Sequence, residues 1–115
     1  MSRQTPSFLP QVAFSILLAL SLRERHGYEI MQQIEADSQG KLRLGPGSLY
    51  GAIKQLDEAG LIIEVASKDQ QDRRRYYKIT EAGRERLGAE IRYFENSVTL
   101  AKERRILGGA VEFYL

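Results

Sequence analysis

The chain has 115 residues, a formal net charge of +2 and no cysteine. This length suits one compact domain with a modest hydrophobic core, which dimerisation would enlarge. The lack of cysteine excludes disulfides, thiolate nucleophiles and cysteine-ligated zinc, and it fits a reducing compartment such as the cytoplasm. Hydrophobic residues make up 43% and charged residues 28%, a composition typical of a folded chain.

The most apolar segment, VAFSILLALSL at residues 12–22, predicts a core helix. It is about half as long as the roughly 20 residues that a transmembrane helix needs. Pro10 suits the first turn of this helix, which we expect to run to about Arg25 before Gly27 breaks it. RERHG follows directly, where a signal peptide would have its cleavage site. The sequence therefore predicts a cytoplasmic protein without a membrane partner.

The second predicted helix covers residues 28–36, and a loop rich in turn-forming residues, DSQGKLRLGPG, follows it. Apolar residues at helical spacing predict one buried stripe on this helix. The stripe consists of Tyr28, Ile30, Met31 and Ile34. His26 is the only histidine, and its place beside Gly27 indicates a helix-terminal or capping role rather than catalysis or metal binding.

The third predicted helix covers residues 46–59, and Gly60 suits the left-handed residue that ends many helices. Its spacing of three and four predicts one buried stripe, formed by Leu49, Ala52, Ile53, Leu56 and Ala59. The polar side carries Ser48, Gly51, Lys54 and Gln55, with Tyr50 on its flank. The glycines at 45 and 47 would let another backbone approach the start of this helix, which attracts phosphate oxygens.

A β-hairpin is predicted next, with Ile62, Ile63 and Val65 in one strand and Tyr76, Tyr77 and Ile79 in the other. The connection is too long for a tight turn and has the form of a wing. It carries three consecutive arginines, residues 73–75, a charge cluster that suits a phosphate backbone. Strand alternation would send Arg73 and Arg75 to one face and Arg74 to the other. Asp69 or Asp72 could neutralise part of the cluster.

The last predicted helix starts after Thr80, a capping residue, with Glu81 in its first turn. Its apolar residues alternate steps of four and three, which predicts a heptad seam for dimerisation. The seam consists of Leu87, Ile91, Phe94, Val98 and Ala101. The tail at 108–115 has no predictable structure. Residues 1–80 thus form a winged helix-turn-helix part and residues 81–115 a dimerisation helix with a short tail, within one compact domain.

The predicted fold is α+β and mainly α, a winged helix-turn-helix with an added C-terminal dimerisation helix. The segments HGYEI, GPGSLYGAIKQLDEAGLI and RRRYYKITEAGRERL resemble, in order and spacing, the PadR-like transcriptional regulators. The resemblance covers roughly residues 10–95, and the short C-terminal part resembles the compact subfamily with one dimerisation helix. It implies a homodimeric repressor that binds double-stranded DNA, with residues 46–59 in the major groove and the wing on the backbone.

Carried over by position, the resemblance assigns DNA contacts to Ser48, Tyr50 and Lys54 of the recognition helix. In the wing it assigns them to Arg74, Arg75 and Tyr76. Gly51 and Gln55 on the same helix face and Arg73 in the same cluster complete the predicted DNA-binding set. Relatives often have Arg or Lys in place of Gln55, so whether Gln55 meets a phosphate or reads a base stays open.

Some compact relatives bind aromatic or cationic drugs between tryptophans, and this chain has no tryptophan. Phe14, Tyr93 and Phe94 could instead line a cavity for a small aromatic effector between the first and last helices. Aromatic side chains at helical spacing also form ordinary interface core, and the sequence leaves both interpretations open.

Two other functions, a protein-interaction module and an enzyme, are alternatives to DNA binding. A winged helix can be a protein-interaction module, but such a module has less reason to keep three consecutive arginines beside its recognition helix. An enzyme is not indicated, because the sequence has no paired carboxylates in an apolar setting, no phosphate-cradling loop and no nucleophile with a nearby base. No cofactor and no metal are expected.

Overall fold

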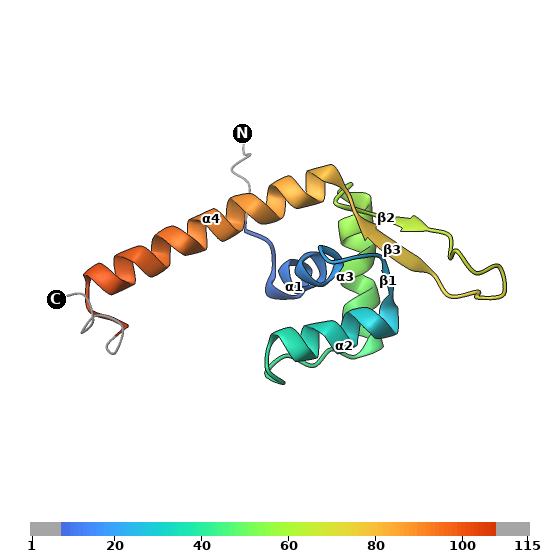
Figure 1. Ribbon diagram of the computed structural model, residues 1–115, viewed down its shortest axis with the longest axis horizontal. Helices are drawn as coiled ribbons and strands as arrows, with labels where there is room; N and C mark the ends of the chain where they lie inside the picture. The colour runs from blue at the N-terminus through green and yellow to red at the C-terminus, as the bar shows by residue number, and fades with distance from the viewer. Residues whose placement is uncertain (1–7, 108–115) are drawn as a thin grey trace.

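The protein is a mainly helical domain with a small sheet at the base of a long hairpin (Figure 1). The computed structural model describes residues 8–107. In chain order the elements are α1 (Gln11–Leu20), β1 (Arg25–His26), α2 (Gly27–Asp37), α3 (Pro46–Glu58), β2 (Ile62–Val65), β3 (Tyr76–Ile79) and α4 (Glu81–Glu103). The predicted class, α+β and mainly α with a winged helix-turn-helix, is confirmed. Within residues 8–107 no helix is both long and apolar enough to cross a membrane.

Helix α1 lies at the centre of the core. Ile16 and Leu17 are fully buried and Leu20 nearly so, and the helix packs against α2, α3, α4 and β3. Ile30 and Ile34 of α2 join this core, and so do Leu49, Ile53 and Leu56 of α3. A helix that touches every neighbour is apolar on most sides, which is why the VAFSILLALSL segment reads as almost uniformly hydrophobic.

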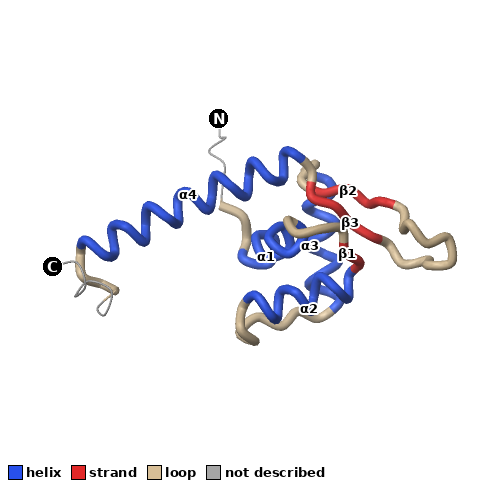
Figure 2. The backbone as a smooth tube through the Cα atoms, in the orientation of Figure 1, coloured by secondary structure: helices blue, strands red, loops and turns tan. Residues whose placement is uncertain are grey.

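The first helix is shorter than predicted, and the sheet has a third strand that the prediction missed. Helix α1 ends at Leu20 instead of near Arg25, because Arg25 and His26 pair with β3 as the short strand β1. The sheet order is β1-β3-β2, and both pairings are antiparallel (Figure 2). The buried Arg25 side chain secures the junction, since its Nε donates to the Ala19 carbonyl at 3.0 Å near the end of α1.

The end of α3 and the hairpin follow the prediction closely. Gly60 has φ +78°, the left-handed conformation, and the Leu61 N–H returns to the Leu56 carbonyl at 3.0 Å. Strand β2 pairs with β3 from Ile62 opposite Ile79 to Val65 opposite Tyr76. The chain between these strands projects from the body as the wing, residues 66–75 (Figure 1).

Helix α4 begins at a residue that also bonds to the end of α3. The Thr80 hydroxyl accepts from the Gly83 N–H at 3.0 Å, as predicted for a cap, and donates to the Gly60 carbonyl at 2.7 Å. The C-terminal half of α4 then leaves the body (Figure 1). The radius of gyration is 17.0 Å, whereas a compact domain of this length has about 13 Å. The projecting half of α4 and the wing at the opposite end account for this elongation.

Two glycines of α4 provide a matched test of how closely its first turns pack on the body. A Cβ added at Gly83 would lie 2.2 Å from the Leu61 carbonyl oxygen and 2.8 Å from the Ile79 side chain, whereas one at Gly88 would have 3.4 Å to the end of the Arg92 side chain. We expect Gly83→Ala to lower the free energy of unfolding by about 1–3 kcal/mol. Gly88→Ala should be neutral or stabilise by roughly 0.5–1 kcal/mol. Urea denaturation at fixed protein concentration measures both, and equal effects would contradict this packing.

Candidate nucleic-acid interface

Helix α3 presents its polar face to solvent. Leu49, Ile53 and Leu56 anchor the other side in the core. The polar residues Ser48, Gly51, Lys54 and Gln55 are exposed, and Tyr50 is 47% exposed. Ala59, which we placed in the buried stripe, is exposed because α3 ends one residue before it. The structure therefore brings the predicted contact residues of this helix together on one open face.

The start of α3 is open to the approach of another chain. Gly45 is the N-cap residue and offers no side-chain cap, and Pro46 occupies the first turn, where its missing N–H costs nothing. A Cβ added at Gly47 would meet nothing within 4 Å. The backbone N–H groups of a helix start carry partial positive charge and bind phosphate oxygens readily. This end of α3 can therefore contribute to an anion-binding surface.

Tyr50 extends the surface from α3 to the start of α2. A Cβ added at Gly27 would lie 2.1 Å from the Tyr50 hydroxyl oxygen, so only glycine lets the tyrosine ring rest there undisturbed. The ring borders a hollow of about 400 Å³ that joins α3, the start of α2 and the wing. Its lining residues are His26, Gly27, Tyr28, Tyr50, Arg74, Arg75 and Tyr77.

Tyr28 is a surface residue that we did not predict from the sequence. We placed it in the apolar stripe of α2, but it is 62% exposed. The buried residues of this helix are Gly27, Ile30 and Ile34, a spacing that points the next position, 28, about 100° away from the core. An aromatic side chain at the first turn of a helix, one position after a buried glycine, is the signal that could have identified it.

The three wing arginines have different surroundings. Arg73 is exposed and has no hydrogen bond or ion pair with any described residue. Arg75 is exposed and lies 3.8 Å from the Glu64 carboxylate. Arg74 folds back onto Asp72, the pairing that the sequence left open. We expected the three arginines to alternate along a strand. This is wrong, because β3 begins only at Tyr76 and the arginines precede it.

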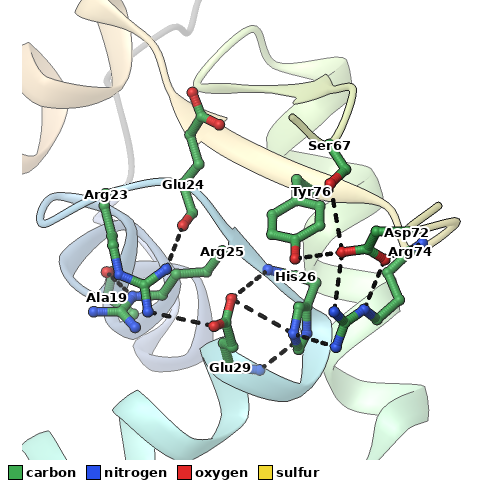
Figure 3. Close-up of polar contacts among 10 residues, drawn as sticks. All are labelled: Ala19, Arg23, Glu24, Arg25, His26, Glu29, Ser67, Asp72, Arg74 and Tyr76. Carbon is green, nitrogen blue, oxygen red and sulfur yellow. Dashed lines mark hydrogen bonds and ion pairs between the residues drawn. The ribbon is translucent and has the colours of Figure 1, made fainter. Parts of the chain in front are cut away.

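Asp72 is the centre of a polar network in the wing (Figure 3). Arg74 binds it with two parallel bonds, Nε to Oδ1 and Nη2 to Oδ2, each 2.9 Å long. The Arg74 backbone N–H adds a third bond at 3.0 Å, and the Tyr76 hydroxyl donates to Oδ2 at 2.7 Å. Ser67 completes the network at 3.4 Å. Tyr76, predicted to contact DNA, is therefore half-buried with its hydroxyl already engaged.

His26 connects this network to α2. It is buried and is the N-cap residue of α2, where its Nδ1 faces the Glu29 N–H and the Glu29 carboxylate accepts from the His26 N–H, so the predicted capping role is confirmed. Its Nε2 lies 3.0 Å from Arg74 Nη1, and its ring packs edge-on against Tyr76. A guanidinium can only donate, so this contact is a hydrogen bond in the tautomer that leaves Nε2 unprotonated.

The predicted dimerisation residues are divided between the core and the surface. Leu87 is 5% exposed and belongs to the core of its own chain, and Ile91 packs against that core. Phe94 is 44% and Val98 45% exposed, and Ala101 is half-buried. The exposed apolar stripe of α4 therefore starts about one turn beyond Ile91.

The three aromatic residues proposed for an effector cavity lie together. Phe14 and Phe94 stack edge to face with ring centroids 5.6 Å apart, and Tyr93 and Phe94 are 5.8 Å apart. Phe8, which the sequence analysis did not include, packs on Tyr93 at 4.8 Å. The Leu9 N–H holds this segment on α4 through a 2.9 Å bond to the Glu90 carboxylate. Among residues 8–107 no acidic, histidine or cysteine cluster could hold a metal ion.

Sequence comparison identifies the family. A profile of the transcriptional regulator PadR-like family matches residues 16–89. The chain belongs to this family. The predicted resemblance is confirmed, and the family consists of transcriptional regulators rather than enzymes.

Two curated relatives cover parts of the chain. An uncharacterised 37.1 kDa protein in a transposon of Streptomyces fradiae is 40% identical over 91 residues, which are 72% of this chain and 25% of that protein. An uncharacterised protein of Lysinibacillus sphaericus is 34% identical over 73 residues, which are 61% of this chain and 66% of that one. The chain thus spans about a quarter of the length of the first relative and about two thirds of the length of the second.

Solved structures share the fold. A PadR family transcription regulator from Clostridium difficile has a TM-score of 0.71 at 23% identity, over 86% of this chain and 100% of that one. Bacillus subtilis PadR, solved in complex with operator DNA, has a TM-score of 0.61 at 20% identity, over 70% of this chain and 46% of that one. A transcriptional regulator from Clostridium thermocellum has a TM-score of 0.68 at 25% identity, over 80% and 90% of the two chains.

The Asp72 network makes a testable prediction about protonation. The Arg74 side chain, followed by the Arg74 backbone N–H and the Tyr76 hydroxyl, holds the pKa of Asp72 well below its ordinary value of 3.8. The ionised carboxylate therefore stabilises the wing above that value, and this contribution is lost as pH falls through the lower folded-state pKa. Arg74→Ala should raise the Asp72 pKa, as followed by carbon-detected NMR titration. An unchanged pKa in this variant would show that Arg74 does not control it.

Proposed function

We propose that this PadR-like protein is a sequence-specific DNA-binding regulator that works as a homodimer. The observation that carries the proposal is the exposed polar face of α3 with an arginine-bearing wing beside it. In the proposed complex α3 enters the major groove, where Ser48, Lys54 and Gln55 reach base edges or phosphates. The wing follows the adjacent backbone. Bacillus subtilis PadR, which has the same fold, was solved with operator DNA, and this supports the proposal.

The dimer part of the proposal is supported by α4. Its outer half carries large apolar side chains, among them Phe94 and Val98, that the other residues of the described range 8–107 leave exposed. Burying such side chains against the same stripe of a second copy removes them from water and gives a symmetric interface. Two copies of α3 related by a two-fold axis would then read half-sites about one helical turn apart, in a pseudo-palindromic operator.

Three finer points complete the proposal. The regulator would act as a repressor by covering a promoter, and it would work in the cytoplasm, where it can reach chromosomal DNA. A small aromatic effector would release it by binding beside Phe14, Tyr93 and Phe94. The edge-to-face stacking of these rings offers aromatic surface for such a molecule.

The experiment that tests the function is selection of bound sequences from random double-stranded DNA, followed by fluorescence anisotropy on the best sequence. We expect a pseudo-palindromic consensus and an affinity that falls steeply between about 50 and 200 mM salt, because phosphate contacts release counterions. A screen of aromatic acids and cations on the bound complex then tests the effector. No enriched sequence and weak salt dependence would favour a protein-interaction module instead.

Lys54 provides a residue-level prediction for the helix. We expect Lys54→Ala to weaken DNA binding and to reduce the slope of log affinity against log salt by about one, the amount for one lost phosphate contact. Lys102→Ala at the far end of α4 is the control, since it removes the same charge away from α3 (Figure 1). Anisotropy titrations at several salt concentrations measure both slopes. Identical slopes for Lys54→Ala and the unmodified protein would remove Lys54 from the phosphate contacts.

Val98 provides the prediction for the dimer. Val98→Asp places a charge in the exposed stripe without touching the core, so we expect a folded monomer with much weaker DNA binding. Asn96→Asp adds the same charge about 200° around the helix and should remain dimeric. Analytical ultracentrifugation gives the oligomeric state, and circular dichroism checks the fold. A stable Val98→Asp dimer would place the interface elsewhere.

A further inference from the structure

We propose that Asp72 and Arg74 are positioning residues of the DNA-binding surface, which together with His26 form a clasp that fixes the wing against the start of α2. Phosphate contacts in the wing then fall to Arg73 and Arg75. This inference rests on the proposed DNA-binding function. It assigns different roles to three consecutive arginines that the sequence alone would treat as equivalent.

Asp72 and Arg74 are already bound to each other. Both carboxylate oxygens of Asp72 accept from the Arg74 guanidinium, and the Tyr76 hydroxyl and the Arg74 backbone N–H add two further bonds. A carboxylate offers about four lone-pair sites, so this one is saturated. The two parallel guanidinium bonds also fix direction, which a single contact between point charges cannot do.

The clasp joins two segments that are far apart in sequence. Arg74 Nη1 reaches Nε2 of His26, which is 48 residues away, over a distance of 3.0 Å. His26 is buried, pairs in β1 and is the N-cap residue of α2, so it is a rigid attachment point. Through it, the part of the wing next to β3 is tied to the element that also carries Gly27, against which Tyr50 of α3 rests.

The clasp contributes little to the stability of the fold. The Arg74 side chain is largely exposed, and exposed ion pairs add little to the stability of a fold. Ordering a loop before it meets its ligand, however, removes an entropy cost that binding would otherwise carry. The clasp therefore acts on the position of the wing and on affinity more than on the stability of the domain.

The two neighbouring arginines remain available for phosphate contacts. Arg73 has no partner among residues 8–107, and Arg75 has a long, exposed contact of 3.8 Å to Glu64 and a further contact with the Tyr77 hydroxyl. Both guanidinium groups can exchange solvent or a weak contact for a phosphate oxygen. Arg74 would have to give up its bidentate bond to Asp72 to do the same.

The test uses two aspartates of the same wing. Asp72→Asn and Asp69→Asn each remove one negative charge, but the Asp69 side chain accepts only the Gln71 backbone N–H among the described residues. If charge alone mattered, both variants would bind the polyanionic DNA more tightly. The clasp predicts that Asp72→Asn binds the selected DNA roughly three- to tenfold more weakly, while Asp69→Asn binds as well as the unmodified protein or better. Tighter binding by both variants would overturn the proposal.

Variants of the arginines provide a second test of the clasp. Arg74→Lys keeps the charge but cannot form the bidentate bond, so we expect the same roughly three- to tenfold loss of affinity, with an unchanged salt slope. Arg73→Lys should bind normally, and Arg73→Ala should reduce the salt slope by about one. A salt slope reduced as much by Arg74→Ala as by Arg73→Ala would show that Arg74 itself meets a phosphate, and the proposal would be wrong.

The third arm needs no DNA and separates the clasp from the proposed function. Hydrogen exchange of the amides of residues 67–75 should be faster in Asp72→Asn than in Asp69→Asn, with equal global stability by urea denaturation. This result would support the clasp even if the unmodified protein bound no DNA, an outcome that would count against the function alone. Equal exchange rates in the two variants would overturn the clasp regardless of how DNA binds.

Discussion

The burial of one side of α3 in the core determines which surface this molecule presents. Leu49, Ile53 and Leu56 fix the rotation of the helix about its own axis, because turning it would expose these side chains and bury Lys54 and Gln55 without partners. The polar face is therefore held outward by the same packing that stabilises the domain. Its exposure is a consequence of the hydrophobic core, and it does not depend on a flexible loop.

The surfaces on α3 and α4 have opposite chemistry. The face of α3 is polar and open at its first turn, and the wing beside it adds arginines. The outer half of α4 leaves the body and carries an apolar stripe that the described residues 8–107 leave exposed. The DNA-binding dimer that we propose needs both kinds of surface, one for a charged duplex and one for a second copy of the chain. The core between them is small and is organised around α1.

Features encoded by nearby residues could be predicted from the sequence. The stripe of α3, the left-handed Gly60, the hairpin strands and the Thr80 cap each depend on residues within a few positions of one another. Strand β1 could not be predicted in this way, because two residues have no periodicity and their partners lie about fifty positions later. The contact between Arg74 and His26 could not be predicted for the same reason, because the two residues are far apart in sequence. The sequence shows that three arginines are consecutive. Only the folded structure shows that one of them, Arg74, is already bound to Asp72 and His26.

Thr80 has a consequence for how the two surfaces are related. Its hydroxyl bonds both to the last turn before β2, at Gly60, and to the first turn of α4, at Gly83. The glycine at 83 lets these segments touch, since a side chain there would collide with the Leu61 carbonyl. The angle between α3 and α4 is thus fixed by a short, rigid junction. In the dimer that we propose, a small change in how the two copies of α4 cross would be transmitted through this junction and would alter the separation of the two α3 faces.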